Sequence, residues 1–357
     1  MHVPGSGDAA GRMFSPIRAS GHWPDHSAAG RASLKPETLM QRSLSLIAVV
    51  AMAMAGAVAS AQEFPTRQVR LVVPFAPGGV SDILARVLAE KLAISWKQSV
   101  LVENRPGAGG ALGADLVAKS AADGHTLLIA DASVVTTNPS LYAGAPKDFA
   151  ALINLARFGQ ILVAPAASPL QSIAELLAWD RDKSARLNVA SSGNGTSNHL
   201  VLEKFKAASK TRMAHVPYKG AGQAIADVAG AQVDLMFTSA PLAQPLIANG
   251  KIRALAVTSL QRMQGFAQVP TLAESGLPGF EWFSVQGMFA PAATPATVLR
   301  RVNADVAAAI GQPELRERWG KMGLEFVDNT PEQFAAWVAA EAVAVKALIQ
   351  AANIKVE

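Results

Sequence analysis

Short apolar runs alternate with amphipathic helical segments from residue 70 almost to the end of the chain. Apolar runs bounded by turns rich in Gly, Pro, Ser and Asn are typical of buried β-strands. Their regular alternation with helical patterns predicts an α/β fold of layered sheets and helices. The predicted strands are 70–75, 99–103, 126–130, 161–164, 188–191, 213–217, 233–238, 252–258 and 282–290. The predicted helices are 82–92, a segment ending near residue 120, 172–179, 197–208, 222–229, 241–248, 295–310, 313–322 and 331–352.

The start of the last predicted helix carries a specific signal. Thr330 fits the N-cap position, Pro331 the first helical position and Gln333 the third. This combination is typical of a capping box with proline at the first turn. It predicts that the helix begins at Pro331.

Two breaks in composition, near residues 163–169 and 278–285, indicate that the chain enters a second domain and then returns. Two crossings make a hinge, and they leave a cleft between two α/β lobes, where ligands commonly bind. We therefore assign residues 62–164 and 285–357 to the first lobe and 165–284 to the second. Each turn from a strand into a helix would then lie at the carboxyl end of its strand, the edge at which open α/β sheets bind ligands.

Residues 40–61 have the pattern of a cleavable signal peptide. Arg42 precedes an apolar stretch over 44–58, and small residues at 59–61 match the site that signal peptidase prefers. The stretch is too short to cross a bilayer comfortably, which argues against a membrane anchor. We expect cleavage before Gln62 and a free protein in the periplasm, because the chain has no cysteine for lipid attachment.

Residues 1–39 are polar, rich in Gly, Ser and Pro, and without periodicity. We expect them to be a non-native or disordered extension, with Met40 as the true initiator. Sequencing the N-terminus of the precursor tests this expectation.

The remaining residues, 62–357, exclude several classes of function. Removing residues 1–61 takes away five Lys/Arg and three Asp/Glu, which leaves a net charge of about +3 with no basic run and few aromatic residues. Binding to nucleic acid is therefore not expected. Cysteine is absent, and the remaining histidines, His125, His199 and His215, lack metal-ligand spacing. We expect no disulfide, no metal site and no cofactor.

The strongest chemical signal is the turn that follows the first predicted strand. Phe75 and Ala76 lead into Gly78 and Gly79, and a helix begins at once with Ser81 as its expected N-cap. Glycines let the backbone approach a ligand closely, and a helix start offers unpaired N–H groups to an anion. The pattern predicts a site for a small anion, with a carboxylate as the favoured class.

Two observations narrow the interpretation of this turn. No Lys-Ser or Lys-Thr pair follows the glycines, so the turn is not a phosphate-binding P-loop. The charge of Asp82 would repel an anion, so we expect its carboxylate to brace the loop. The alternative is a purely structural turn between strand and helix, in which the glycines only permit the bend.

A second candidate loop, 191–199, follows the predicted strand 188–191. Four hydroxyl groups, two glycines and a helix start lie together in it, which suits hydrogen bonds to an oxyanion. The loop does not match the G-x-S-x-G elbow of hydrolases, and no Asp–His arrangement can be tied to Ser192. The alternative is a structural loop capped by Thr196 or Ser197.

A third candidate loop follows the predicted strand 213–217. Tyr218 could present its ring or hydroxyl there, and Lys219 could pair with a carboxylate. A solvated lysine is the alternative, since lysine at a strand end is usually exposed.

The glycine run 107–113 does not add a nucleotide site, because Leu112 stands where the G-x-G-x-x-G pattern requires glycine.

Longer motifs carry a family resemblance that covers nearly all of residues 64–354. They are FAPGGVSD (75–82), VENRPGAGG (102–110), DGHTLL (123–128), NPSLY (138–142), GNGTS (193–197), HVPYKG (215–220), QVDLMF (232–237), RALAVT (253–258) and VPTLAESGLPG (269–279). With these motifs the chain resembles the Bug-type solute receptors of tripartite tricarboxylate transporters. The resemblance implies a type II periplasmic binding fold, in which two α/β lobes close on a small carboxylate.

The resemblance also implies which residues contact the ligand. Carried over to this chain, they are Phe75, Ala76, Gly78, Gly79, Ser81, Ser133, Gly195, Thr196, Ser197, Tyr218, Lys219 and Thr238. The chain departs from the family at Val80, where a third glycine is frequent, and at His125, where tyrosine is frequent. It is also several residues shorter between Tyr142 and Lys147. Because of this departure at Val80, the ligand of a relative is a weaker guide to the ligand of this chain.

These observations favour a binding protein over an enzyme, because no paired carboxylates, cysteine nucleophile or metal ligands are present. The leading hypothesis is a monomeric periplasmic receptor that captures a small carboxylate and delivers it to a membrane transporter. One alternative is a ligand sensor that docks onto a membrane-bound sensor kinase. Another is a hydrolase that uses Ser192 or Ser197, for which the sequence offers no base.

Overall fold

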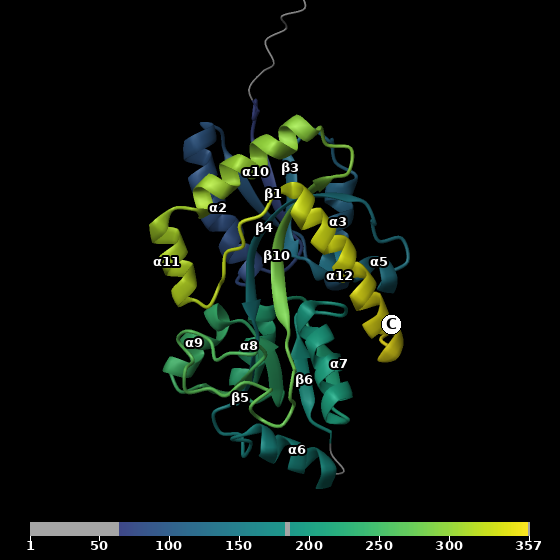
Figure 1. Cartoon of the computed structure of the whole chain (residues 1–357), viewed down its shortest axis with the longest axis vertical. Coiled ribbons are helices and arrows are strands. Elements are labelled where there is room, and N and C mark those ends of the chain that lie inside the picture. Colours follow the sequence, from purple (N-terminus) through teal and green to yellow (C-terminus); the bar gives the residue numbers. More distant parts are fainter. Residues whose placement is uncertain (1–63, 183–185, 356–357) are drawn as a thin grey trace, which may run out of the picture. The chain divides into compact units, whose positions relative to one another are not determined.

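The structure, a computed structural model, describes residues 64–182 and 186–355 (Figure 1). Residues 62–357 form one compact unit, and its described part contains two five-stranded sheets with helices packed against them. The predicted extension (1–39), the predicted signal peptide (40–61) and the expected N-terminus at Gln62 lie outside the described residues.

The first sheet has the strand order β2-β1-β3-β10-β4. β1 pairs in parallel with β2 and β3, whereas β10 pairs in the antiparallel direction with β3 and β4. The strands are β1 (Val69–Val73), β2 (Val100–Asn104), β3 (Thr126–Asp131), β4 (Phe149–Gly159) and β10 (Phe283–Pro291). The helices of this half, which we call the first lobe, are α2 (Val80–Trp96), η1 (Ala108–Gly110), α3 (Ala111–Ala118), α4 (Ser133–Thr136), α5 (Asn138–Leu141), α10 (Ala296–Ile310), α11 (Pro313–Lys321) and α12 (Pro331–Ala351).

The second sheet has the order β7-β6-β8-β5-β9. β6 pairs in parallel with β7 and β8, and β5 pairs in the antiparallel direction with β8 and β9. The strands are β5 (Ile161–Pro165), β6 (Asn188–Ser191), β7 (Ala214–Pro217), β8 (Leu235–Thr238) and β9 (Ile252–Val257). The helices of this half, the second lobe, are α6 (Ile173–Asp182), α7 (Ser197–Ser209), α8 (Ala221–Ala229) and α9 (Ala240–Ala248).

Both sheets follow one plan. Three parallel strands are joined through helices, and a strand from another part of the chain inserts antiparallel beside the third of them. The inserted strands, β10 and β5, are apolar on both faces: seven of nine residues of β10 are apolar or glycine, and every residue of β5 is buried. Burial on both faces explains why these strands read as continuous apolar runs. The predicted α/β class with two lobes is confirmed.

The chain passes between the sheets at Gln160 and again along residues 258–282. The lobe boundary expected after residue 164 falls elsewhere, because β5 pairs with β8 and β9 in the second sheet. The break in composition at 163–169 marks the end of β5 and not the crossing itself. We therefore place the first boundary at Gln160, while the second crossing ends where β10 begins at Phe283.

The predicted helices and strands agree with the structure to within a few residues at most ends, with one large omission. β4 was not predicted, although it is the longest strand among the described residues. Its sequence, FAALINLARFG, is rich in alanine, which has low β-propensity. Its place in the sheet comes from pairing with β10 along its whole length, which no local pattern reveals.

Helix α12 contacts both lobes. It begins with the predicted capping box, in which the Gln333 N–H donates to Thr330 Oγ1 and the Thr330 N–H donates to Gln333 Oε1. Near its start Phe334 is buried in the core of the first lobe, and near its end Ile349 packs with Leu200 of α7. Its apolar composition and length would also fit a membrane span; Phe334, Val345 and Ile349 are the buried residues of this helix, whereas Val343 is exposed.

Candidate functional site

A cleft between the lobes is lined by strand ends and helix starts from both sheets. The first lobe contributes Phe75, Ala76, Gly79, Val80, Ser81, Asp82, Asp131, Phe158, Ser284 and Gln286. The second lobe contributes Ser192, Thr196, Ser197, Asn198, Ala221, Thr238, Ser239 and Leu242. Seven of the predicted site residues lie in this lining: Phe75, Ala76, Gly79, Ser81, Thr196, Ser197 and Thr238.

Four helices begin at the cleft. The residues that precede them are Gly79 for α2, Thr196 for α7, Gly220 for α8 and Ser239 for α9, and none of the four makes a side-chain capping hydrogen bond. The first N–H groups of a helix lack partners within the helix, and the helix dipole favours a negative charge beside them. Helix starts from both lobes can therefore donate hydrogen bonds to one bound anion.

Asp82 braces the turn before α2, as predicted. Its carboxylate accepts hydrogen bonds from the Gly78 N–H at 3.1 Å, from Asn104 Nδ2 at 3.0 Å and from Arg86 at 2.9 and 3.0 Å. Burial acts to raise the pKa of Asp82, but these hydrogen bonds outweigh it and hold the pKa below its usual value. Asn104 also donates to the Phe75 carbonyl, so the loop is held at both ends.

Ser81 is not the N-cap of α2, which corrects the expectation from the sequence. Gly79 takes that position with an extended backbone, and the helix already includes Val80 and Ser81. The Ser81 hydroxyl instead donates to Gln286 Oε1 at 2.6 Å. This contact joins the start of α2 to strand β10.

The start of α7 is joined to the crossing strands by a buried polar network. Gln160 donates from Nε2 to Ser197 Oγ at 3.1 Å and to Ser284 Oγ at 2.7 Å, and its Oε1 accepts from Asn198 at 3.0 Å. The Trp282 indole N–H also donates to Ser197 Oγ. Gln160 is fully buried at the first crossing, so the network couples the cleft to the hinge.

Two hydroxyl groups of the cleft have no hydrogen-bond partner among the described residues. They are Thr238 Oγ1, at the end of β8, and Ser239 Oγ, before α9, and both are buried. Buried polar groups are seldom left without a partner, and those that are often mark a functional site. We therefore treat these two hydroxyls as candidate ligand contacts.

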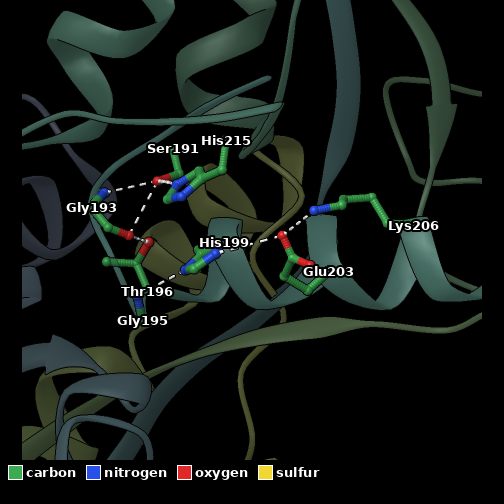
Figure 2. Close-up of polar contacts among 8 residues, drawn as sticks. All are labelled: Ser191, Gly193, Gly195, Thr196, His199, Glu203, Lys206 and His215. Atoms are coloured by element: carbon green, nitrogen blue, oxygen red, sulfur yellow. Dashed lines mark hydrogen bonds and ion pairs between the residues drawn. The ribbon is translucent and has the colours of Figure 1, made fainter. Parts of the chain in front are cut away.

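The loop before α7 is held in shape by a stacked histidine pair (Figure 2). The rings of His199 and His215 lie 3.8 Å apart and are nearly parallel. His199 Nδ1 accepts from the Gly195 N–H at 3.1 Å, and His215 Nε2 lies 2.6 Å from Ser191 Oγ. Burial, with a further effect of the neighbouring His199, lowers the pKa of His215 to about 3. His215 is therefore neutral at ordinary pH.

Glu203 extends this cluster along α7 (Figure 2). Its Oε1 lies 2.8 Å from Lys206 Nζ and 3.7 Å from His199 Nε2. Burial acts to raise the pKa of Glu203, but its contacts with His199 and Lys206 keep the pKa below its usual value. The result is a chain of polar contacts from Lys206 to the backbone of the loop before α7.

The other predicted site residues lie around the cleft and not in its lining. Tyr218 donates its hydroxyl to Asp227 Oδ2 at 2.7 Å, so the hydroxyl is engaged by α8. Lys219 lies at the cleft mouth, where its carbonyl accepts from the Ala76 N–H at 3.4 Å. Gly195 packs against α5, the Gly78 N–H donates to Asp82, and Ser133 lines a smaller adjoining cavity.

The lobes also touch at the mouth of the cleft. Tyr142, after α5, donates its hydroxyl to the Asn194 carbonyl at 3.0 Å. Gly109 has φ of +57°, and a Cβ at this position would overlap the same carbonyl oxygen. The structure therefore has the two lobes in contact around the cleft.

Several cleft residues could not be singled out from the sequence. They are Asp131, Ser239, Ser284 and Gln286, together with Gln160 in the network that joins the cleft to the first crossing. Ser284 and Gln286 stand two apart in a predicted strand, so they share one face, and this is the signal that could have found them. The others reach the cleft only through the topology of the sheets.

The charge of the cleft is unusual for an anion site. Of the described residues that line it, none is Lys, Arg or His, and the charged ones are Asp82 and Asp131. Asp82 is paired with Arg86, whereas Asp131 accepts only from the Ser133 N–H at 2.9 Å and from Gln286 Nε2 at 3.2 Å. Helix starts and hydroxyls are thus the donors available to an anion.

The hydrolase hypothesis gains no support from these contacts. Ser192 Oγ donates to Asn198, and Ser197 Oγ is held by Gln160, Ser284 and Trp282, so neither contacts a histidine. Ser191 does contact His215, but it is fully buried. Among the described residues no group of three or more His, Asp and Glu is placed to hold a metal ion.

Comparison with known proteins identifies the family. The family model described as "Tripartite tricarboxylate transporter family receptor" matches residues 84–354. The chain belongs to this family. It is 38% identical over 297 residues to the "UPF0065 protein in tcbD-tcbE intergenic region" of a Pseudomonas species, covering 81% of this chain and 88% of that protein. It is 34% identical to Protein BugT of Bordetella pertussis, covering 85% and 94%.

Solved structures of family members confirm the fold. An R. palustris protein solved with adipate has a TM-score of 0.79 and 34% identity, covering 82% of this chain and 99% of that one. MatC from Rhodopseudomonas palustris with bound malate has a TM-score of 0.76 and 30% identity, covering 80% and 100%. The periplasmic binding protein BugD has a TM-score of 0.77 and 33% identity, covering 82% and 99%. The predicted type II periplasmic binding fold and the Bug-type resemblance are confirmed.

Proposed function

We propose that this protein is a periplasmic receptor that captures a small carboxylate and delivers it to a tripartite tricarboxylate-type transporter. The observation that carries the proposal is the cleft at which uncapped helix starts from both lobes meet. Backbone N–H groups and hydroxyls suit a carboxylate, and the two family members described above were solved with adipate and malate.

The ligand carboxylate would accept hydrogen bonds from the turn before α2 and from the loop before α7. The unpartnered hydroxyls of Thr238 and Ser239 would complete its shell of donors. Phe75, Phe158 and Leu242 provide an apolar wall for the rest of the ligand. A ligand with a carboxylate at one end and a short carbon body fits both parts of the cleft.

Capture would work by closure of the lobes about the crossings at Gln160 and 258–282. A ligand held from both sides stabilises the closed form, since it binds that form better than an open one. The sequence signals at 40–61 support export, and the proposed role needs neither catalysis nor a cofactor. We propose that the exported receptor acts as a monomer.

A thermal-shift screen tests the proposal. The protein comprising residues 62–357 is scanned with mono-, di- and tricarboxylates, amino acids and aromatic acids, and with the matching amides as controls. At about 100 times the dissociation constant a true ligand adds about 2.7 kcal/mol, or roughly 5–10 °C for a chain of this size. The amide of that ligand should give no shift. A screen in which no small acid raises the midpoint would contradict the proposal.

Delivery to a transporter is tested separately. Membrane vesicles that contain the membrane subunits of a tripartite tricarboxylate-type transporter should take up the ligand only when the receptor is added. Uptake that is unchanged without the receptor would count against delivery, while leaving capture of the ligand intact.

A further inference from the structure

A small cavity adjoins the cleft on the side of strand β3, and it is acidic. Asp131 and Ser197 line both spaces, and the cavity is further lined by Ser133 and by Glu341 of α12. No Lys, Arg or His is among the described residues that line it. Two carboxylates thus face one space without a basic side chain.

Asp131 has capacity for a further partner. Each of its oxygens accepts one hydrogen bond, Oδ1 from the Ser133 N–H and Oδ2 from Gln286, and each keeps a free lone pair. Burial raises the pKa of Asp131 to about 6 against the lowering effect of Ser133, and the nearby Glu341 adds a smaller rise. A carboxylate that is buried without a counter-ion is costly, and a cation beside it would offset that cost.

The surroundings of Asp131 supply a second hydrogen-bond acceptor for such a cation. Ser133 Oγ is buried, lines the same cavity and has no hydrogen-bond partner among the described residues. A basic group of a packed element, Lys204 of α7, acts to lower the pKa of Glu341. Its Nζ donates to the Glu281 carbonyl at 2.7 Å and lies over the Trp282 ring, so it is engaged elsewhere.

The acidic cavity is close to the proposed anion site. Ser81, at the start of α2, is hydrogen-bonded to Gln286, and Gln286 is hydrogen-bonded to Asp131. Two hydrogen bonds therefore separate the helix start from the acidic side chain. A ligand of a few heavy atoms can contact both.

We propose that the ligand is a small amino carboxylate, whose carboxylate binds at the helix starts and whose ammonium group binds between Asp131 and Ser133. The inference rests on the proposed function and adds the class of ligand. One positive charge on the ligand balances Asp131, whereas a dicarboxylate without nitrogen would bring a second negative charge toward two acids. The cleft should therefore prefer the nitrogen-containing member of any pair of acids of equal length.

Calorimetry at pH 7.5 with matched pairs tests this preference: alanine with propionate, aspartate with succinate, and glutamate with glutarate. In the pair that binds best, we expect the amino member to bind at least about tenfold more tightly, the effect of one charge-assisted hydrogen bond. Asp131→Asn should weaken binding of the amino member by about 10- to 100-fold and bring the pair to similar affinity. Ser133→Ala should reduce the preference by a smaller factor.

Asp148→Asn is the matched control, because Asp148 is exposed and lies outside the cleft. It should leave both affinities unchanged. Retained binding of the nitrogen-free acid by Asp131→Asn shows that the variant folds. If nitrogen-free acids bind the unaltered protein as tightly as the amino acids, or if neither Asp131→Asn nor Ser133→Ala changes the ratio, the inference is wrong while the proposed function stands. If no acid of either kind binds, the proposed function itself fails.

Discussion

At the scale of single residues, the cleft keeps polar groups that do nothing for the stability of the fold. Thr238 and Ser239 bury hydroxyls without partners, and Asp131 buries a carboxylate without a counter-ion. Each of these costs free energy in the ligand-free protein. Buried polar groups without partners are often explained by what they bind.

Thr238→Val tests the role of an unpartnered hydroxyl. Valine has almost the same shape, so the variant removes the buried hydroxyl and leaves the packing of β8 unchanged. We expect the free protein to be as stable as before or slightly more stable, and affinity for the ligand to fall by about 5- to 20-fold, the effect of one hydrogen bond of about 1–1.5 kcal/mol. Thermal midpoints and calorimetry measure the two effects. Unchanged affinity would show that Thr238 does not contact the ligand.

His215 makes the protein sensitive to acid. Its pKa is about 3 in the folded chain and about 6.5 when unfolded, so the unfolded state takes up a proton first as the pH falls. This contribution to stability is complete above about pH 6.5 and is lost toward pH 3, at roughly 1.4 kcal/mol for each pH unit below about 6.

Chemical denaturation between pH 7.5 and 4.5 checks the effect of His215. His215→Gln should be less stable than the unaltered protein at pH 7.5, because it loses the ring stack with His199. Its stability should also fall less steeply on acidification. Parallel pH profiles for the two proteins would show that His215 is not the acid-sensitive group.

At the scale of elements, the sequence was informative wherever a local pattern decides the structure. The turn after β1, the loop after β6 and the capping box of α12 were all identified from spacing and residue type. β4 was missed because alanine-rich strands carry little local signal, and the boundary at Gln160 was missed because it depends on which sheet β5 joins. Asp131 and Gln160 entered the site only with the topology, since neither stands in a distinctive motif.

The turn at Gly109 contacts the loop before α7, and we expect this contact to affect binding. Alanine at 109 would be driven against the Asn194 carbonyl, which keeps the lobes from making this contact. We expect Gly109→Ala to lower ligand affinity by at least about tenfold. The substitution disfavours the closed form, and the apparent affinity falls with the population of the form that binds the ligand. Calorimetry measures the affinity, and small-angle scattering measures closure.

Gly144→Ala provides the matched control for this variant. Gly144 has φ of +80°, so alanine there meets similar backbone strain, but nothing lies within 4 Å of the added Cβ. Its affinity should stay close to that of the unaltered protein. Equal losses in both variants would attribute the effect to backbone strain and not to the contact between the lobes.

At the scale of the whole molecule, two sheets built on one plan bring their helix starts to a shared cleft. The crossing strands form the hinge, and the buried amide of Gln160 ties the hinge to the start of α7. Helix α12 contacts the cores on both sides, since Phe334 belongs to the first lobe and Ile349 packs with Leu200 of the second. This architecture supports the proposal that backbone groups from both lobes hold the ligand.

The structure of the protein crystallised with the best acid from the thermal-shift screen tests this account most directly. We predict carboxylate oxygens within hydrogen-bond distance of N–H groups at the starts of both α2 and α7, and of the hydroxyls of Thr238 or Ser239. A carboxylate bound instead by Lys204 or Arg157 in the groove beside α12, with the cleft free of ligand, would contradict the account.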